Sequence, residues 1–190
     1  MKKNLFILFL IFLIPTKSFG LIEVDITRGN LNPLPLAVSP LSIDNNSKKS
    51  FENILKKENI GSEISIIVEN NLRTSGLFNP LNKDAFLQAP DIANLKPRFE
   101  DWNLIKAQAL ITGKVKYVDD KLRVEFRLWD VLAAKEMMAL AFTTVPSNWR
   151  RVGHIISDKV YERLTGEKGY FDTRIIYVAE EGPKTQRKKR

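Results

Sequence analysis

His154 is the one histidine of the sequence, so a Ser-His-Asp triad would need it as the general base. The chain has no cysteine, which excludes a disulfide framework, a thiolate metal site and a cysteine nucleophile. A site with two or three histidine ligands is excluded by number. No GxSxG, GxGxxG or GxxxxGK(S/T) motif is present. We therefore expect no enzyme activity, cofactor or metal, and we interpret His154 as a packed or surface residue of a helix.

Two other stretches contain residue types that could do chemistry. Asp119 and Asp120 are adjacent carboxylates, but they lie between two alternating segments, where aspartate is a good turn former. The stretch LTGEKG at residues 164–169 holds glycine and lysine without the spacing of a phosphate-binding loop. We interpret the first as a hairpin turn and the second as a helix end followed by a linker.

The net charge of +8 is concentrated at the two ends of the chain. Residues 1–20 and residues 182–190 carry basic side chains and no acidic ones, and the residues between them are balanced. A balanced core is unlike the footprint of a nucleic-acid-binding fold, so we expect no nucleic-acid partner. We interpret the basic tail, Lys184 to Arg190, as a solvated end; the alternative is a tail that binds anionic lipid or nucleic acid.

The N-terminus has the pattern of a secretory signal peptide over residues 1–20. Lys2 and Lys3 precede the apolar run LFILFLIFLI, which is too short to span a bilayer but fits the apolar region of a signal peptide. Ser18 and Gly20 are small residues at the −3 and −1 positions of a cut between Gly20 and Leu21. We expect cleavage there, export from the cytoplasm and no stable membrane insertion; the alternative is an uncleaved anchor.

The segment that would begin the mature chain alternates between apolar and polar residues. Ile22, Val24 and Ile26 are apolar, whereas Glu23, Asp25 and Thr27 are polar, a period typical of a strand. A free extended segment can pair with the sheet edge of a partner protein. It can equally be an edge strand of its own domain, and the residues alone do not separate these two interpretations.

The following residues predict an α/β domain that begins with a short strand at Leu34 to Val38. Residues 44–50 read as loop. A helix follows, with the apolar stripe Ile60, Ile64, Ile67, Val68 and Leu72 on a 3.6-residue period. We expect Gly61 to break this helix, Ser62 to cap its second part and Gly76 to end it. Residues 78–97 are rich in turn formers and are expected to connect elements rather than to pack.

The second half of the domain predicts a sheet and another helix. A short helix is expected over residues 100–106. Residues 111–117 and 122–128 alternate around the Asp119–Asp120 turn and predict a hairpin with one buried and one charged face. Residues 136–145 are apolar on both faces, which predicts a central strand. Ser147 or Asn148 would cap a last helix, with Trp149, Val152, Ile156, Val160 and Leu164 on its apolar face and Gly166 at its end.

These elements predict a two-layer α/β (α+β) fold, a mixed β-sheet with two main helices on one face. Residues 174–179 read as a further strand beyond the domain, with no partner before it in the chain. Five stretches resemble the N-terminal region of the TolB family of the Tol–Pal system of Gram-negative bacteria: IEVDITRG, PLAVSPL, LRTSGLFNPL, ALITGKV and SDKVYERLTGEKGYFDTRIIYVAEE. The resemblance covers residues 21–181 and implies an N-terminal domain with the same arrangement of sheet and helices.

In that family a β-propeller follows, and the resemblance implies that TRIIYVAEE is its first strand. We therefore expect a chain truncated before the propeller. Its expected parts are a signal peptide (1–20), an extended partner-binding segment (21–33), an α/β domain (34–166), and a linker with the start of a propeller (167–190).

The resemblance also implies partners. In the family the inner-membrane protein TolA is reached through the mature N-terminus, which here comprises Leu21, Ile22, Glu23, Val24, Asp25, Ile26, Thr27 and Arg28. The lipoprotein Pal docks on the propeller, whose surface these residues do not supply. The leading hypothesis is a non-enzymatic periplasmic component that supports outer-membrane integrity and invagination during division. The alternative is a secreted α/β domain with a tail that binds anionic lipid or nucleic acid.

Overall fold

A computed structural model describes residues 32–174, 178, 180–183 and 188–189. The predicted signal peptide, its cleavage site at Gly20 and Leu21, and the predicted binding segment Leu21 to Arg28 lie outside these described residues. Within the described part, no helix combines the length and the apolar character needed to cross a bilayer.

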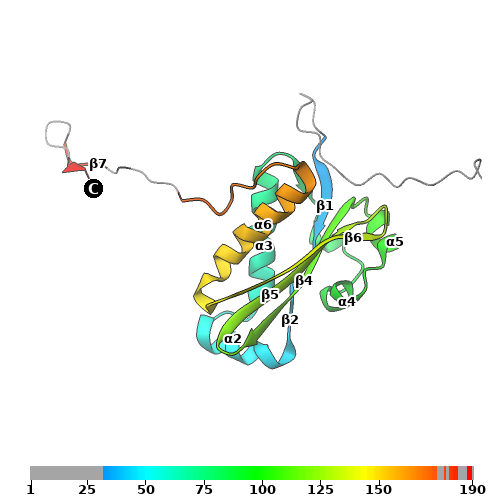
Figure 1. Cartoon of the computed structure of the whole chain (residues 1–190), viewed down its shortest axis with the longest axis horizontal. Coiled ribbons are helices and arrows are strands. Elements are labelled where there is room, and N and C mark those ends of the chain that lie inside the picture. Colours follow the sequence, from blue (N-terminus) through cyan, green and yellow to red (C-terminus); the bar gives the residue numbers. More distant parts are fainter. Residues whose placement is uncertain (1–31, 175–177, 179, 184–187, 190) are drawn as a thin grey trace, which may run out of the picture.

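The domain is built on one mixed sheet with the strand order β3-β1-β4-β5-β6 (Figure 1). β1 (Leu34–Val38) lies between β3 (Phe78–Pro80) and β4 (Ala109–Val118) and runs parallel to both. β4, β5 (Lys121–Asp130) and β6 (Lys135–Thr144) are antiparallel neighbours, and the short β2 (Ser42–Ile43) pairs in parallel with β4. The predicted mixed sheet is confirmed, and so is the strand at Leu34–Val38.

The β4–β5 hairpin turns at Asp119 and Asp120, as predicted. Both residues have positive φ, 50° and 56°, and the ladder closes with Val118 opposite Lys121. A two-residue turn with both central residues in the left-handed region matches the twist of the strands it joins, and aspartate tolerates that region. The Asp120 carboxylate also accepts a hydrogen bond from the Tyr117 hydroxyl at 2.9 Å. The two carboxylates therefore have a turn role.

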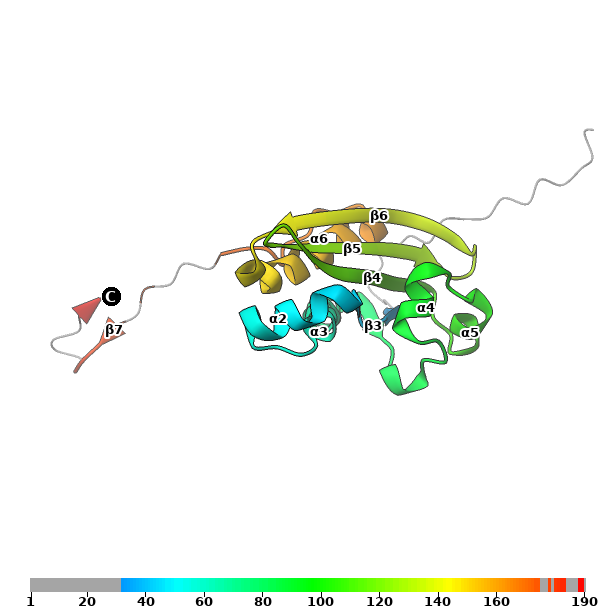
Figure 2. The ribbon, with the colours of Figure 1, turned by 90° about the horizontal axis from the view of Figure 1, so that it is seen from below.

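The prediction that residues 136–145 form a central strand is wrong, because β6 is an edge strand of the sheet (Figure 2). Its helix-side residues Met138 and Phe142 pack against the core, which accounts for one apolar face. The opposite face owes its apolar character to Ala139 and Ala141, which are exposed and too small to require a covering layer. Apolar composition on two faces therefore does not report whether another strand lies alongside.

Two long helices cover one face of the sheet, as predicted. α3 (Ile60–Thr74) and α6 (Trp149–Thr165) enclose the main core with the inward residues of β1, β4 and β5. The predicted stripes of both helices lie on this core, with only Ile67 partly exposed. Gly76 after α3 and Gly166 after α6 have φ near +75°, the left-handed conformation that commonly ends a helix. Both predicted stops are confirmed.

The predicted cap of α3 is wrong, whereas the predicted cap of α6 is right in position, at Asn148, but not in its hydrogen bond. Asn59 caps α3 by accepting a hydrogen bond from the Ser62 backbone N–H, so Ser62 lies inside the first turn. Gly61 is also helical, and a Cβ placed there would lie 2.0 Å from the Leu41 carbonyl oxygen, so glycine permits close packing rather than a break. At α6, Asn148 makes no capping bond; its amide donates to the Thr144 hydroxyl.

Two segments expected to lack packed structure are ordered elements. Residues 44–50 form a 3₁₀ turn, Asn45–Ser47, and the start of α2 (Lys48–Leu55), whose Phe51 is buried. Residues 78–97 contain β3, a 3₁₀ turn at Lys83–Ala85 and α4 (Pro90–Leu95). α4 and α5 (Phe99–Leu104) lie on the sheet face opposite α3 and α6 (Figure 1).

A second, smaller core lies beneath α4 and α5. Its buried residues are Ala37, Ala93, Trp102, Ala107, Leu110 and Val131. Gln88 orders this region from inside, because its side-chain oxygen accepts from the Trp102 indole and the Arg98 backbone while its amide donates to the Lys96 carbonyl. Turn-forming residues and small alanines concealed this packing in the sequence.

The end of the chain also departs from expectation. Most of the predicted strand at 174–179 lies outside the described residues, and Val178 within it is exposed. Beyond it, β7 (Glu180–Glu181) pairs antiparallel with β8 (Lys188–Lys189), a pairing that was not predicted.

Candidate functional site

The described structure begins at residue 32 and shows the position of the strand that follows the predicted binding segment in the chain. Residues 32 and 33 lead directly into β1, and the Leu34 backbone N–H donates to the Leu77 carbonyl at 2.9 Å. β1 is hydrogen-bonded on both sides, and all but one of its residues are buried. The strand at the start of the described domain is therefore an interior strand of the sheet and not an edge strand.

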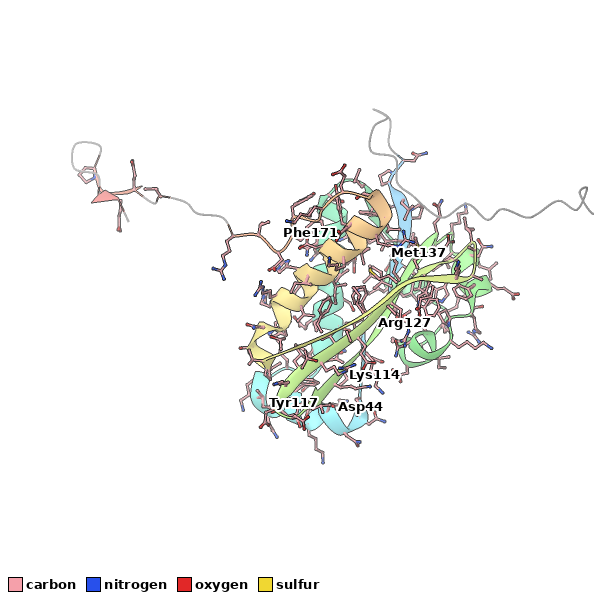
Figure 3. The ribbon with its side chains drawn as sticks, in the orientation of Figure 1. Asp44, Lys114, Tyr117, Arg127, Met137 and Phe171 are labelled. Atoms are coloured by element: carbon pink, nitrogen blue, oxygen red, sulfur yellow. The ribbon has the colours of Figure 1, made fainter. Side chains whose placement is uncertain are left out.

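The uncovered part of the sheet presents a network of charged side chains from the β4–β5 hairpin (Figure 3). Lys116 and Arg123 lie directly opposite each other, a repulsive arrangement by itself. Glu125 lies between them and accepts from Arg123 at 2.8 Å and from Lys116 at 3.2 Å. The bond from Arg123, and next that from Lys116, lower the pKa of Glu125, which keeps this carboxylate ionised.

Two further ion pairs extend the network toward both ends of the sheet. The Lys114 ammonium lies 2.8 Å from the Asp44 carboxylate, and this hydrogen bond lowers the pKa of Asp44. Arg127 lies 3.3 Å from Glu136 of β6 and donates to the Asn94 side chain. The sequence predicted a charged face on this hairpin; it did not show that Asp44 and Asn94, from distant segments, complete it.

A polar hollow adjoins this face where the 3₁₀ turn Asn45–Ser47 approaches α4. Its volume is about 360 Å³, and its lining residues are Ser42, Ile43, Asp44, Asn45, Asn46, Asp91, Asn94 and Lys114. The lining offers amide, carboxylate and ammonium groups but no nucleophile with a base beside it. Among the described residues, no three histidine, aspartate or glutamate side chains gather as a metal site would require. Such a surface can bind a polar chain by hydrogen bonds.

His154 has a structural position between the two long helices. Its Nδ1 lies 2.9 Å from the Asn71 side-chain nitrogen, which also donates to the Ser157 hydroxyl at 2.9 Å. Because the amide nitrogen is a donor, Nδ1 of His154 accepts, and the ring proton is assigned to Nε2. The residue joins α3 to α6, in agreement with the interpretation as a packed helix histidine.

The segment after α6 is held against that helix by contacts that the sequence did not reveal. The Asp158 carboxylate accepts from the backbone N–H groups of Phe171 and Asp172, at 2.6 and 3.1 Å. Phe171 packs on the main core near Tyr161, and Figure 3 shows it beside the C-terminal part of α6. The predicted linker therefore begins with an ordered strap, defined here as residues 169–172.

Comparison with known proteins places these features in a family. Residues 22–137 match the family model for the TolB amino-terminal domain. A "Tol-Pal system protein TolB" from Pelagibacter ubique (strain HTCC1062) is 83% identical over 188 residues, which is 99% of this chain and 42% of that protein. The crystal structure of TolB from Acinetobacter baumannii has a TM-score of 0.62 at 25% identity, over 83% of this chain and 35% of that one. The chain thus spans less than half the length of these relatives.

Proposed function

Because the chain belongs to the TolB family and carries its amino-terminal domain, we propose that it acts as a non-enzymatic, periplasmic binding component of the Tol–Pal system. The observation that carries this proposal is the extent of the family match. It begins at residue 22 and continues to residue 137, so one match includes most of the predicted binding segment and the strands β1 to β5. The described surface offers hydrogen-bonding and charged groups, which suit binding rather than catalysis.

The binding step that we propose is strand addition by residues 21–28 to a TolA-like inner-membrane protein. Main-chain hydrogen bonds would supply affinity, and the alternating side chains would supply specificity. Ile22, Val24 and Ile26 would face the partner's core, while Glu23 and Asp25 would remain toward solvent or toward basic groups. β1 follows this segment in the chain and lies inside the sheet, so we expect a bound partner to be coupled to the domain.

This binding would place the protein in the cellular roles that the resemblance implies, namely outer-membrane integrity and invagination of the outer membrane during division. Binding of a Pal-like lipoprotein is a separate matter. The resemblance assigns it to the propeller of the family, and we propose no Pal-binding role for the described residues.

The test is a calorimetric titration of a soluble TolA domain with the protein lacking residues 21–28. We expect binding to be lost while the far-ultraviolet circular dichroism and the melting temperature remain unchanged, because the deleted residues precede β1. Two substituted proteins of unchanged length separate the contributions of the apolar and the acidic side chains. Serine at Ile22, Val24 and Ile26 should abolish binding, whereas Glu23→Gln with Asp25→Asn should weaken it less. Unchanged affinity of the deleted protein would refute the proposal.

A further inference from the structure

The outer side of β6 is an open strand edge. β5 occupies its inner side in an antiparallel ladder from Leu122 opposite Thr144 to Asp130 opposite Lys135. No strand formed by the described residues pairs with the outer side (Figure 2). A strand in this position presents a row of backbone N–H and C=O groups that can pair with another chain.

β6 lacks most of the features that protect such edges in other proteins. No charged residue and no proline occurs from Met137 to Val145. A bulge between the pairs of Leu128 and Trp129 leaves Met137 out of register, and the Arg163 side chain donates to its carbonyl at 3.3 Å. Bulges and basic groups protect strand edges, so this end of β6 is covered. The stretch Met138 to Thr144 remains open.

The side chains of this stretch are symmetric in size about Leu140. Met138, Leu140 and Phe142 lie on the helix side, and Leu140 is 38% exposed. Ala139 and Ala141 lie on the opposite side and are exposed. Read in either direction from Leu140, the first residue is small and the second is large, so the symmetry spans Met138 to Phe142. In an antiparallel pairing with itself, the strand would set Met138 against Phe142 and Ala139 against Ala141.

We propose that β6 is a self-association surface on which the β6 strand of a second copy pairs antiparallel, centred on Leu140. Charge selects the direction. Lys135 and Glu136 lie at one end of the strand only, so a parallel pairing would put like charges side by side. The antiparallel pairing places Glu136 beside Thr143 of the other copy. In the antiparallel pairing a neutral residue therefore faces Glu136, and the repulsion of the parallel pairing is avoided.

The charges around β6 also favour a second copy over a different protein. Arg123 is paired with Glu125, and Arg127 with Glu136, within the same chain. The open stretch from Met138 to Thr144 carries no charged residue of its own, so it does not select an acidic or basic partner. A neutral strand of symmetric size is matched best by its own sequence. The two sheets would join into one, with both helix layers on the same side because directly opposed residues share a face.

The absence of cysteine makes a cross-linking test clean, since each introduced cysteine is the only one. In the proposed register, Leu140 of the two copies would be directly opposed, with Cα atoms about 4.5–5.5 Å apart. That distance is suited to a disulfide. Leu140→Cys in residues 21–190 should therefore give a disulfide-linked dimer under mild oxidation. In the same register, residue 144 of one copy lies eight residues along the strand from residue 144 of the other, which is about 27 Å at 3.4 Å per residue. Thr144→Cys should therefore not form a disulfide-linked dimer.

Leu104→Cys is the control for random collision, because Leu104 is 74% exposed and lies in α5, away from the sheet edge. Cross-linking of Leu140→Cys no greater than that of Leu104→Cys would overturn the proposal. Equal cross-linking of Leu140→Cys and Thr144→Cys would also overturn it, because that pattern indicates parallel pairing. A mixture of Met138→Cys and Phe142→Cys proteins should cross-link, whereas each of these alone should not.

A second measurement does not depend on oxidation. Sedimentation equilibrium of the unmodified protein should show a mass that rises toward that of a dimer with concentration. The double substitution Ala139→Lys and Ala141→Lys would place lysines of the two copies opposite each other. Both positions are exposed, so the fold should remain intact and the protein should become monomeric. Leu104→Lys should leave the dimer unchanged. A protein that is monomeric at every concentration would refute the inference.

Discussion

Arg151 and Asp172 form a two-pronged ion pair that joins α6 to the strap after it. The Arg151 Nε lies 3.0 and 3.1 Å from the two carboxylate oxygens of Asp172, and a terminal guanidinium nitrogen lies 3.0 Å from one of them. The Asp172 carboxylate raises the pKa of Arg151. Gly169 lies so close to Asp158 that a Cβ would approach the Asp158 Cα to 2.4 Å. The strap thus has a defined path along the helix.

We expect unequal effects from the two residues of α6 that anchor the strap, Asp158 and Arg151. Asp158→Ala would leave the Phe171 and Asp172 amides without an acceptor, and bonds to a charged group contribute about 1.5–3 kcal/mol. We expect a loss of stability in that range by guanidinium unfolding, with faster amide exchange at Phe171 and Asp172. Arg151→Leu should cost less, because Arg151 is exposed and its ion pair is screened.

Lys159→Ala provides the control for the strap, since it breaks a surface ion pair on the same helix without touching residues 169–172. Its stability and the exchange at Phe171 should match those of the unmodified protein. If Asp158→Ala were as stable as Lys159→Ala, the strap would not be anchored as described.

We predict that Gln88 stabilises the second core. Gln88→Ala would leave the Trp102 indole and the Arg98 amide without their shared acceptor, in a region where Gln88 is 4% exposed. An unsatisfied buried donor costs about 1–3 kcal/mol, so we expect a loss of this size and a change in Trp102 fluorescence.

The matched control for Gln88 is Gln108→Ala, because Gln108 takes part in backbone bonds that this substitution leaves in place. Its effect should be much smaller. Equal stability of the Gln88→Ala protein and the unmodified protein would contradict the role of Gln88 as the organising residue of α4 and α5.

Glu125 predicts a pH dependence of stability. Arg123 and Lys116 lower its pKa from 4.5 in the folded protein, so the folded state binds its proton less readily than the unfolded chain. The resulting stabilisation is present above pH 4.5 and is lost as the pH falls through the lowered pKa. Because Glu125 is partly exposed, we expect only about a few tenths of a kcal/mol.

Urea unfolding from pH 7 to pH 3 would measure this effect against Glu125→Gln, which retains the shape of the side chain. The gap in unfolding free energy between the two proteins should be present at pH 7 and should close below pH 4.5. A gap that is constant over this range would show that the carboxylate charge contributes nothing to stability.

Local signals in the sequence were sufficient where one segment decides its own conformation. Asp119 and Asp120 between two alternating runs determined the hairpin, because residues that tolerate positive φ in a two-residue turn set the register of both strands. The apolar stripe from Trp149 to Leu164, ended by Gly166, determined α6 in the same way. The mixed sheet with two helices on one face follows from combining such elements.

The tertiary structure decided what depends on neighbours distant in the chain. The apolar composition of β6 could not show whether a strand lies beyond it, because composition reflects the burial of faces and not the pairing of edges. Gln88 orders the second core only because the fold brings the Trp102 indole and the Arg98 backbone within hydrogen-bond distance of its side chain. Asp44 likewise joins the charged face only because Lys114 lies beside it. The predicted binding segment, Leu21 to Arg28, stays a prediction from its alternation and its family. A pattern along one segment encodes local geometry, whereas edges, buried polar contacts and surfaces arise only when separate segments pack together.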